Sequence, residues 1–201
     1  IQLPFLNPHF FGNLKKHSEV SCTKTIFVTV GRLYYAGKSY QTLMEYAQSV
    51  SGCAEFWLIG WLPRKELLPE LPENVQYLGM LSFSEMFKKL SQADYFLPML
   101  DPHQKEHQAY LGGCTTGCLQ LILGFNLVPV IHKTYGEHYH FSEKTALFYD
   151  DSSFAATMNA AMKTPSEQRK RMQCALEEKA ASLYQQSLNS LKKMLEPAQM
   201  Q

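Results

Sequence analysis

Two loops of this sequence carry residues that could bind a phosphorylated ligand. The first, residues 31–39, opens with Gly31 and Arg32 and contains Lys38. Gly31 allows a sharp turn, and the two cations flank a loop that leads into a predicted helix. Cations, exposed amides and a helix N-terminus together form a diphosphate site. The same pattern also fits a plain turn with two solvated basic side chains, and it is not the Gly-x-Gly-x-x-Gly motif of NAD-binding proteins.

The second loop, residues 99–117, ends in small residues before an apolar helix. Thr115, Thr116 and Gly117 offer two hydroxyls and backbone amides at that helix start, an arrangement that suits a phosphate or a ribose. The neighbouring glycines could alternatively serve only to bring a helix close to a sheet. Because two hydroxyls at a buried helix start need hydrogen-bond partners, the pattern favours a bound ligand.

Two shorter turns could hold a flat base. Gly60 ends a predicted second strand, and the turn from Leu78 to Leu81, with Gly79 in it, follows a predicted third strand. Backbone amides with apolar neighbours can hold a base, but ordinary packing at a strand end explains such turns equally well. These turns become informative only in combination with the two loops.

The histidines and cysteines do not match a metal-binding or nucleophilic motif. Seven histidines are present, but no carboxylate or cysteine stands at a standard zinc-ligand spacing. His138 and His140 are expected on one side of an extended segment, and Cys114 and Cys118 lie one helical turn apart without a second pair. The Gly-x-Ser-x-Gly motif of many serine hydrolases is absent. We therefore predict no metal site and no hydrolase-type nucleophile.

The elements that position these loops alternate regularly. Apolar, β-branched and aromatic runs predict strands at 25–30, 55–59, 75–78, 94–97, 128–131 and 146–149. Helical spacing of apolar residues predicts helices at 39–50, 82–90, 116–125 and 152–162, and a long last helix from 164. This alternation implies right-handed βαβ units, hence an α/β fold with a doubly wound parallel sheet of about six strands. Such sheets bind ligands at the carboxyl ends of their strands, near the switch point.

Two helix starts match a capping box. Ser82 and Glu85 open the helix at 82–90, and Thr164 and Glu167, with Pro165 at the first helical position, open the last helix. The predicted inner face of that last helix is formed by Met172, Leu176, Ala180, Leu183, Ser187, Leu191 and Met194.

Length and composition narrow the class of protein. The chain has 201 residues, of which 45% are hydrophobic and 18% charged, which excludes a disordered chain. A net charge of +1 excludes a bulk electrostatic attraction to nucleic acid or an anionic membrane. No apolar run approaches the roughly 20 residues of a membrane span. Five cysteines without a secretory leader indicate reduced thiols and a cytoplasmic location. Because the chain begins at Ile1, we expect a fragment of a longer protein.

Several features, taken in order, resemble the C-terminal, donor-binding half of two-domain GT-B glycosyltransferases, especially the bacterial group that includes retaining family 4. They are Gly31-Arg32 with Lys38 beyond, Gly60, Val75 to Gly79, Ala93-Asp94, and a small-residue helix before Val128 to Ile131. The resemblance implies three parts. Residues 1–24 are an interdomain linker, 25–163 a nucleotide-sugar-binding domain, and 164–201 a long helix that packs back toward an N-terminal domain missing from this chain.

The resemblance also assigns roles to residues. It implies that Arg32 and Lys38 hold the donor diphosphate and that Leu78 to Leu81 line the base. The residues implied to meet the ribose and the phosphates are Thr115, Thr116 and Gly117.

One feature of family 4 is missing from this sequence. Family 4 enzymes usually carry two glutamates eight positions apart around the helix before the Pro-Val-Ile strand. Here Glu106 is followed eight positions later by Cys114, and Gln120 is the nearest polar residue on the helix. The sequence therefore departs from the family at the contacts to the donor sugar and the ribose.

The activity implied by the resemblance is sugar transfer without a cofactor or metal, from a UDP- or GDP-sugar to a saccharide or lipid-linked acceptor, as in polysaccharide biosynthesis. Charge that builds on the leaving diphosphate would be stabilised by cations and helix N-termini. We expect the isolated domain to be inactive, with the acceptor site and any contact with the inner face of a membrane on the N-terminal domain. The alternatives are a GT-B sugar-nucleotide epimerase, a non-catalytic α/β interaction domain and a ligand-free GT-B partner subunit.

Overall fold

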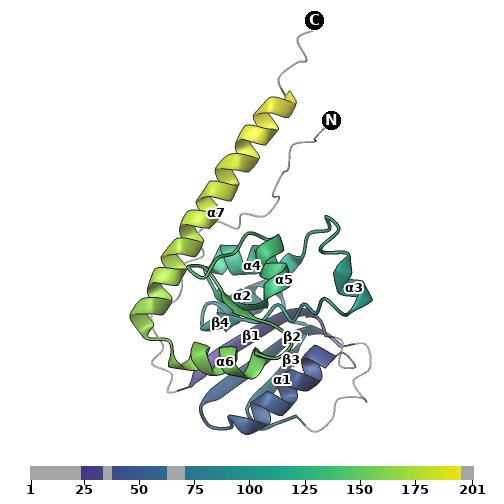
Figure 1. The fold of residues 1–201 in the computed structure, drawn as a ribbon, viewed down its shortest axis with the longest axis vertical. Coiled ribbons are helices and arrows are strands. Elements are labelled where there is room, and N and C mark those ends of the chain that lie inside the picture. Colours follow the sequence, from purple (N-terminus) through teal and green to yellow (C-terminus); the bar gives the residue numbers. More distant parts are fainter. Residues whose placement is uncertain (1–23, 34–37, 63–70, 196–201) are drawn as a thin grey trace, which may run out of the picture.

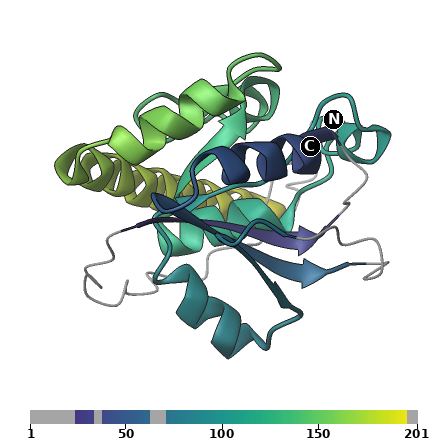
Figure 2. The same cartoon turned by 90° about the horizontal axis from the view of Figure 1, so that it is seen from below.

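A computed structural model describes residues 24–33, 38–62 and 71–195, without the side chains of residues 38 and 39. This part forms one parallel sheet with helices on both faces (Figures 1 and 2). Residues 1–23 of the predicted linker and residues 196–201 of the predicted C-terminal helix lie outside the described residues. The predicted division into linker, domain and helix therefore stays a prediction.

Six strands form the sheet of the described part: β1 (Thr25–Arg32), β2 (Ala54–Trp61), β3 (Val75–Gly79), β4 (Tyr95–Phe96), β5 (Val128–His132) and β6 (Leu147–Tyr149). All neighbours are parallel, in the order β3-β2-β1-β4-β5-β6. The predicted α/β fold with a doubly wound six-stranded sheet is thus confirmed. The strand order reverses between β1 and β4, so the loops after these strands flank the switch point.

Buried aromatic side chains join the middle of the sheet. Phe27 of β1 stacks on Phe56 of β2 and on Tyr95 of β4, with ring centroids 5.3 Å apart in both pairs. The strand register pairs the same residues, and all three are buried. Burying one such side chain stabilises the fold by roughly 1.5 to 3 kcal/mol. This row of rings therefore fixes the three strands around the switch point.

Seven helices accompany these strands in the described chain: α1 (Lys38–Ser49), α2 (Phe83–Leu90), α3 (Lys105–Gln108), α4 (Gly117–Phe125), α5 (Lys133–His138), α6 (Phe154–Lys163) and α7 (Ser166–Leu195). α1 and α6 lie on one face of the sheet (Figure 2), where the Tyr46 hydroxyl donates to Asn159 Oδ1 at 2.8 Å. α2 and α4 pack together on the opposite face, with Phe87 and Phe125 rings 5.3 Å apart. α4 also contacts α7.

Two of the predicted helix starts are confirmed, and one is wrong. The Ser82 hydroxyl accepts from the Glu85 N–H, and the Glu85 carboxylate accepts from the Ser82 N–H, so α2 has the predicted capping box. Thr116 caps α4. Thr164 instead donates its hydroxyl to the Ala160 carbonyl at 2.8 Å. Because only two residues separate α6 from α7, Thr164 ends the first helix instead of capping the second.

The short helices α3 and α5 were not predicted. They have four and six residues, too few to show a periodic apolar stripe. The segment expected to be extended through His138 and His140 is instead the end of α5 and a turn, in which His140 has φ +55°. The N-cap of α5 is His132, whose Nδ1 accepts from the Thr134 N–H at 3.3 Å. Histidine is not among the usual capping residues, so the sequence pattern gives no sign of this start.

The long helix α7 is buried only along its first half. Met172, Leu176 and Ala180 are buried, as predicted. Leu191 and Met194, predicted on the same inner face, are exposed, and the helix extends past the body of the sheet (Figure 1). The apolar stripe is therefore longer than the surface that the described residues offer to it. Within the described residues, no helix has the length and apolar character needed to cross a membrane.

Candidate functional site

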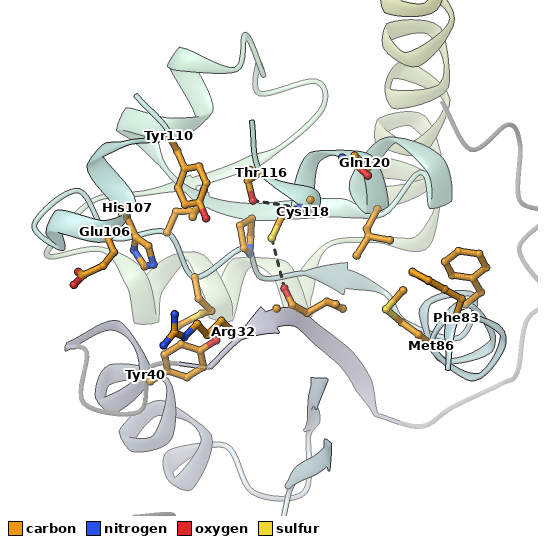
Figure 3. A pocket seen from close by; sticks show the side chains of 18 residues that line it. Arg32, Tyr40, Phe83, Met86, Glu106, His107, Tyr110, Thr116, Cys118 and Gln120 are labelled. Atoms are coloured by element: carbon orange, nitrogen blue, oxygen red, sulfur yellow. Dashed lines mark hydrogen bonds between the residues drawn. The ribbon is translucent and has the colours of Figure 1, made fainter. Parts of the chain in front are cut away.

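A pocket of about 600 Å³ opens at the switch point of the sheet (Figure 3). It is bounded by the end of β1, the loop after β4, the start of α4 and one side of α2. Pockets of 300–1,000 Å³ commonly hold small molecules, and open α/β sheets bind ligands at this place. Both its size and its position mark it as the candidate site.

A pair of glycines shapes the ends of β1 and β2. Gly31 and Gly60 lie opposite each other in the register, with φ values of +144° and +139°, a region that other residues rarely adopt. A Cβ on Gly60 would collide with the Gly31 carbonyl oxygen, whereas a Cβ on Gly31 would meet nothing within 4 Å. The close approach of two strands thus accounts for Gly60 without a ligand. Gly31 lines the pocket.

Arg32 follows this glycine pair and lines the pocket. It is paired in register with Trp61, and its guanidinium carbon lies 4.7 Å from the centroid of the Trp61 ring. Trp61 is 47% exposed. A guanidinium over an indole face is held by a cation–π interaction. The end of the β1–β2 pair therefore places a positive charge at the pocket wall.

The N-terminus of α4 lines the pocket next to β1. Thr116 Oγ1 accepts from the Cys118 N–H at 3.3 Å, and the first turn of α4 holds no acidic residue. Gly117 and Cys118 line the pocket. The Cys118 thiol donates to the Val30 carbonyl at 3.6 Å, which joins α4 to β1, and burial raises the pKa of Cys118. The Cys118 thiol thus has a structural role. The positive end of the α4 helix dipole favours an anion in the pocket.

The loop after β4 is held in place by its own hydrogen bonds. Met99 is buried with φ +52°, a strained conformation for a residue with a side chain. The Asp101 N–H donates to His107 Nδ1 at 2.9 Å, and Asp101 Oδ1 accepts from the His103 N–H at 2.8 Å. These bonds bring Glu106 and His107 to the pocket wall.

His107 is set up as a neutral hydrogen-bond donor. It is 9% exposed, and burial lowers the pKa of its imidazole. Because Nδ1 accepts from the Asp101 N–H, the proton of a neutral ring resides on Nε2. An imidazole in this state donates from Nε2 and does not act there as a base or a metal ligand.

The opposite end of the pocket is apolar. Phe83, Met86 and Phe87 of α2 line it together with Leu121 of α4, and Figure 3 shows Phe83 and Met86 on the side away from Arg32 and His107. Phe83 is 74% exposed, with its ring centroid 5.9 Å from that of Phe87. Aromatic and thioether side chains of this kind form a surface for a flat ring.

The structure brings part of the predicted site together. The predicted residues Gly31, Arg32, Thr116 and Gly117 line the pocket. The side chain of Lys38 lies outside the described part of the chain. The predicted residues that are described but do not line this pocket are Gly60, Leu78, Gly79, Leu81 and Thr115.

The sequence singled out the loop at residues 99–117 after β4, but it gave no binding role to the residues that form the polar wall. Glu106, His107 and Tyr110 line the pocket, but they lie in and after a four-residue helix without a motif. The apolar residues Phe83, Met86 and Phe87 were predicted only as a helix face. Their place directly after the predicted base-binding turn was the available signal.

A second cavity of about 50 Å³ shares Met99 and Leu100 with the first, and two histidines and three aspartates are among the residues that line it. His103 Nε2 lies 2.8 Å from one oxygen of Asp151, and His132 Nε2 lies 3.4 Å from the other. His132 Nδ1 accepts from the Thr134 N–H, so its Nε2 carries the proton of a neutral ring. Hydrogen bonding from His103 lowers the pKa of Asp151. Across the residues that the structure describes, no three His, Cys, Asp or Glu side chains are arranged to hold a metal ion.

Comparison with known proteins identifies the fold. No protein-family model and no curated protein sequence matches the chain. Among solved structures, the lipopolysaccharide outer core galactosyltransferase WaaB aligns with a TM-score of 0.62 and 15% identity over 94% of this chain and 55% of its own. HepE of Anabaena in complex with UDP aligns with a TM-score of 0.62 and 12% identity over 85% of this chain and 49% of its own.

An isolated C-terminal domain also aligns. It belongs to LpcC, a group 1 glycosyl transferase of Francisella tularensis, and matches with a TM-score of 0.55 and 12% identity over 82% of this chain and 85% of its own. The chain thus spans about half of WaaB and HepE but most of this domain. Its fold is that of the C-terminal domain of GT-B glycosyltransferases.

Proposed function

We propose that the pocket binds a nucleotide-diphosphate sugar and that the chain is the donor-binding part of a glycosyltransferase. The observation that carries this proposal is the convergence of Arg32 and the N-terminus of α4 on one pocket at the switch point. The description of HepE in complex with UDP and with UDP-glucose supports the same ligand class. A receiver-like signalling domain would need acidic residues at the end of β1, where this chain has Gly31 and Arg32.

The diphosphate is assigned to the middle of the pocket. Arg32 offers a planar set of N–H donors that matches phosphate oxygens, and the start of α4 adds its dipole and backbone amides. Lys38 begins α1 directly after the loop that follows β1, and we assign its ammonium to the same phosphates. As the diphosphate leaves, these groups stabilise its growing negative charge.

The sugar is assigned to the wall formed after β4. A carboxylate such as Glu106 accepts hydrogen bonds from hydroxyls, and the Nε2–H of a neutral His107 donates one. Glu106 would repel a phosphate, so its place in the pocket favours a neutral, hydroxyl-rich group there. A sugar that is joined to the diphosphate satisfies both requirements.

The base is assigned to the apolar end of the pocket. Phe83, Met86 and Phe87 present aromatic and thioether surface there, and a base stacks on such a surface irrespective of its hydrogen-bonding edge. This shifts the base from the predicted turn at Leu78–Leu81 to the first turns of α2. The shift is small along the chain, because α2 begins two residues after that turn.

The acceptor and the group that activates it are assigned to a further domain. The donor pocket lies at the carboxyl ends of the central strands β1 and β4, and transfer needs an acceptor aligned with the anomeric carbon. Such alignment is worth roughly 7 to 11 kcal/mol of a reaction barrier. We therefore propose that this chain binds the donor but does not transfer sugar by itself, and that the acceptor is a saccharide or a lipid-linked saccharide.

Calorimetric titration of the chain with UDP, GDP, UDP-glucose and uridine tests this proposal. We expect one of the two diphosphates to bind with at least tenfold higher affinity than uridine, because charge-assisted contacts contribute roughly 1.5 to 3 kcal/mol. The affinity should be the same with EDTA. Absence of heat with every nucleotide at millimolar concentration would refute the donor site. Loss of binding in EDTA would refute the metal-independent assignment.

A further inference from the structure

We propose that Trp61 is a positioning residue, whose indole holds the Arg32 guanidinium in the orientation that contacts the diphosphate. This proposal rests on the donor-binding function proposed above. Trp61 is not among the residues that line the pocket, whereas Arg32 is. Trp61 thus acts on the ligand through Arg32 and not by touching the ligand.

The backbone places the two side chains together. β1 and β2 are parallel and in register from Thr25 and Ala54 to Arg32 and Trp61. Residues paired in this way on neighbouring strands point to the same face of a sheet. The Leu33 N–H donates to the Trp61 carbonyl at 2.9 Å, which continues the pairing beyond the strands. The backbone pairing before and after Arg32 and Trp61 therefore holds these two residues side by side.

The glycine pair makes this contact possible. Gly31 and Gly60 both have positive φ, at the positions directly before Arg32 and Trp61. The two positive φ values stand at matched positions of the ladder, and the following residues Arg32 and Trp61 keep their register. The sequence Gly-Arg in β1 and Gly-Trp in β2 thus builds one joint feature.

A stacked arginine is a better phosphate ligand than a solvated one. A free arginine side chain loses close to 2 kcal/mol of rotamer entropy when it is fixed. The indole face restricts the orientation of the guanidinium plane before the ligand arrives. Preorganisation of this kind raises affinity without adding a contact to the ligand.

The same strand contains a second stack that serves as a control. The Lys89 ammonium lies 4.3 Å from the centroid of the Trp57 ring, four residues before Trp61 on β2. Neither Trp57 nor Lys89 lines the pocket. Lys89→Ala removes the cation of this second stack. It therefore disrupts a cation–π pair of the same type at a place that does not contact the proposed ligand.

The test is a double-mutant cycle on ligand binding, measured by calorimetry with UDP and with uridine. The variants are Arg32→Ala, Trp61→Ala, the double variant, Trp61→Phe and Lys89→Ala. We expect Trp61→Ala to weaken UDP about two- to fivefold, the size of an exposed cation–π pair. It should leave uridine unchanged, and Trp61→Phe should restore most of the UDP affinity. Lys89→Ala should bind UDP like the wild type.

The double variant decides the mechanism. In the Arg32→Ala background, Trp61→Ala should cause no further loss of UDP affinity, because the indole has nothing left to position. An equal loss in both backgrounds, or a loss for uridine, would overturn the proposal by showing that Trp61 contacts the ligand directly. An unchanged UDP affinity in Trp61→Ala would overturn it as well. If the wild type binds no nucleotide, the donor-binding function itself fails, which is a separate result.

Discussion

The two ends of the pocket are built in different ways. The polar end depends on paired backbone features: two glycines at matched positions of β1 and β2, and a loop after β4 that Asp101 and His107 hold together. The apolar end depends on one face of α2, where Phe83 is 74% exposed. Backbone-defined sites tolerate few substitutions, whereas an exposed helix face tolerates many. Substitutions of the backbone-defining residues at the polar end should therefore lower the stability of the fold. Substitutions at the apolar end should change only ligand binding.

The largest effect is expected at the glycine pair. Gly60→Ala adds a Cβ that collides with the Gly31 carbonyl, whereas Gly31→Ala meets no atom within 4 Å at a similar φ. Backbone strain alone costs roughly 1 to 3 kcal/mol, so Gly31→Ala should lose about that much, and Gly60→Ala clearly more. Urea denaturation of both variants measures the difference. Equal losses would show that the strands separate freely at this position.

The next effect is expected at Arg32. Arg32→Ala should weaken UDP by roughly 1.5 to 3 kcal/mol, the range for hydrogen bonds to charged groups, and leave uridine unchanged. The free energy of unfolding should stay within about 0.5 kcal/mol of wild type, as for other surface positions. Calorimetry and urea denaturation check the two statements. An equal loss of affinity for uridine would contradict the assignment of Arg32 to the phosphates.

A smaller effect with the opposite pattern is expected at the apolar end. Phe83→Ala should weaken UDP and uridine to the same extent, by roughly 1 kcal/mol, at the low end of the range for a base stacked on an aromatic ring. Phe83→Leu keeps the apolar surface without the ring and separates stacking from burial. If Phe83→Ala affects UDP but leaves uridine unchanged, the base does not lie at this end.

The last effect concerns the protonation of His107 and the pH dependence of stability. Burial lowers the pKa of His107 in the folded protein, so the unfolded chain takes up a proton near pH 6.5 while the folded chain does not. The free energy of unfolding should therefore fall as the pH drops below about 6.5, by at most about 1.4 kcal/mol per pH unit for one proton. In His107→Gln, whose amide oxygen can accept the Asp101 N–H, this part of the decline should vanish. Identical profiles for both proteins would show that His107 protonates freely.

The sequence predicts the strands and the fold of this protein better than the residues of its pocket. Runs of apolar, β-branched and aromatic residues locate all six strands, because this pattern is local in the sequence. Arg32, Thr116 and Gly117 were found because they follow strands or begin a helix. Glu106 and His107 lie in the predicted loop 99–117 but received no binding role, because their place in the pocket depends on the Asp101 hydrogen bond and the positive φ of Met99. Neither feature has a sequence pattern.

The apolar stripe of α7 shows the converse error. Periodicity predicts that a helix face is apolar, but it does not say how long the opposing surface is. Met172, Leu176 and Ala180 find that surface in the described part of the chain, whereas Leu191 and Met194 remain exposed. Whether the apolar face of the second half of α7 is buried thus depends on the tertiary structure and not on the periodicity of the sequence.

Because α7 is buried only along its first half, its two halves should differ in amide hydrogen exchange. Its start is tied to the sheet, because Arg169 pairs with Asp94 at 3.2 Å and Asp94 accepts from the Ile26 N–H at 2.9 Å. In the described part of the chain, Leu183 is the last leucine or methionine of α7 that packs against the core, and a helical segment of about 12–15 residues is only marginally stable alone in water. Amides there should exchange through local opening, and those before Ala180 only when the sheet unfolds. One continuous helix thereby belongs to two cooperative units, with the boundary near Ala180.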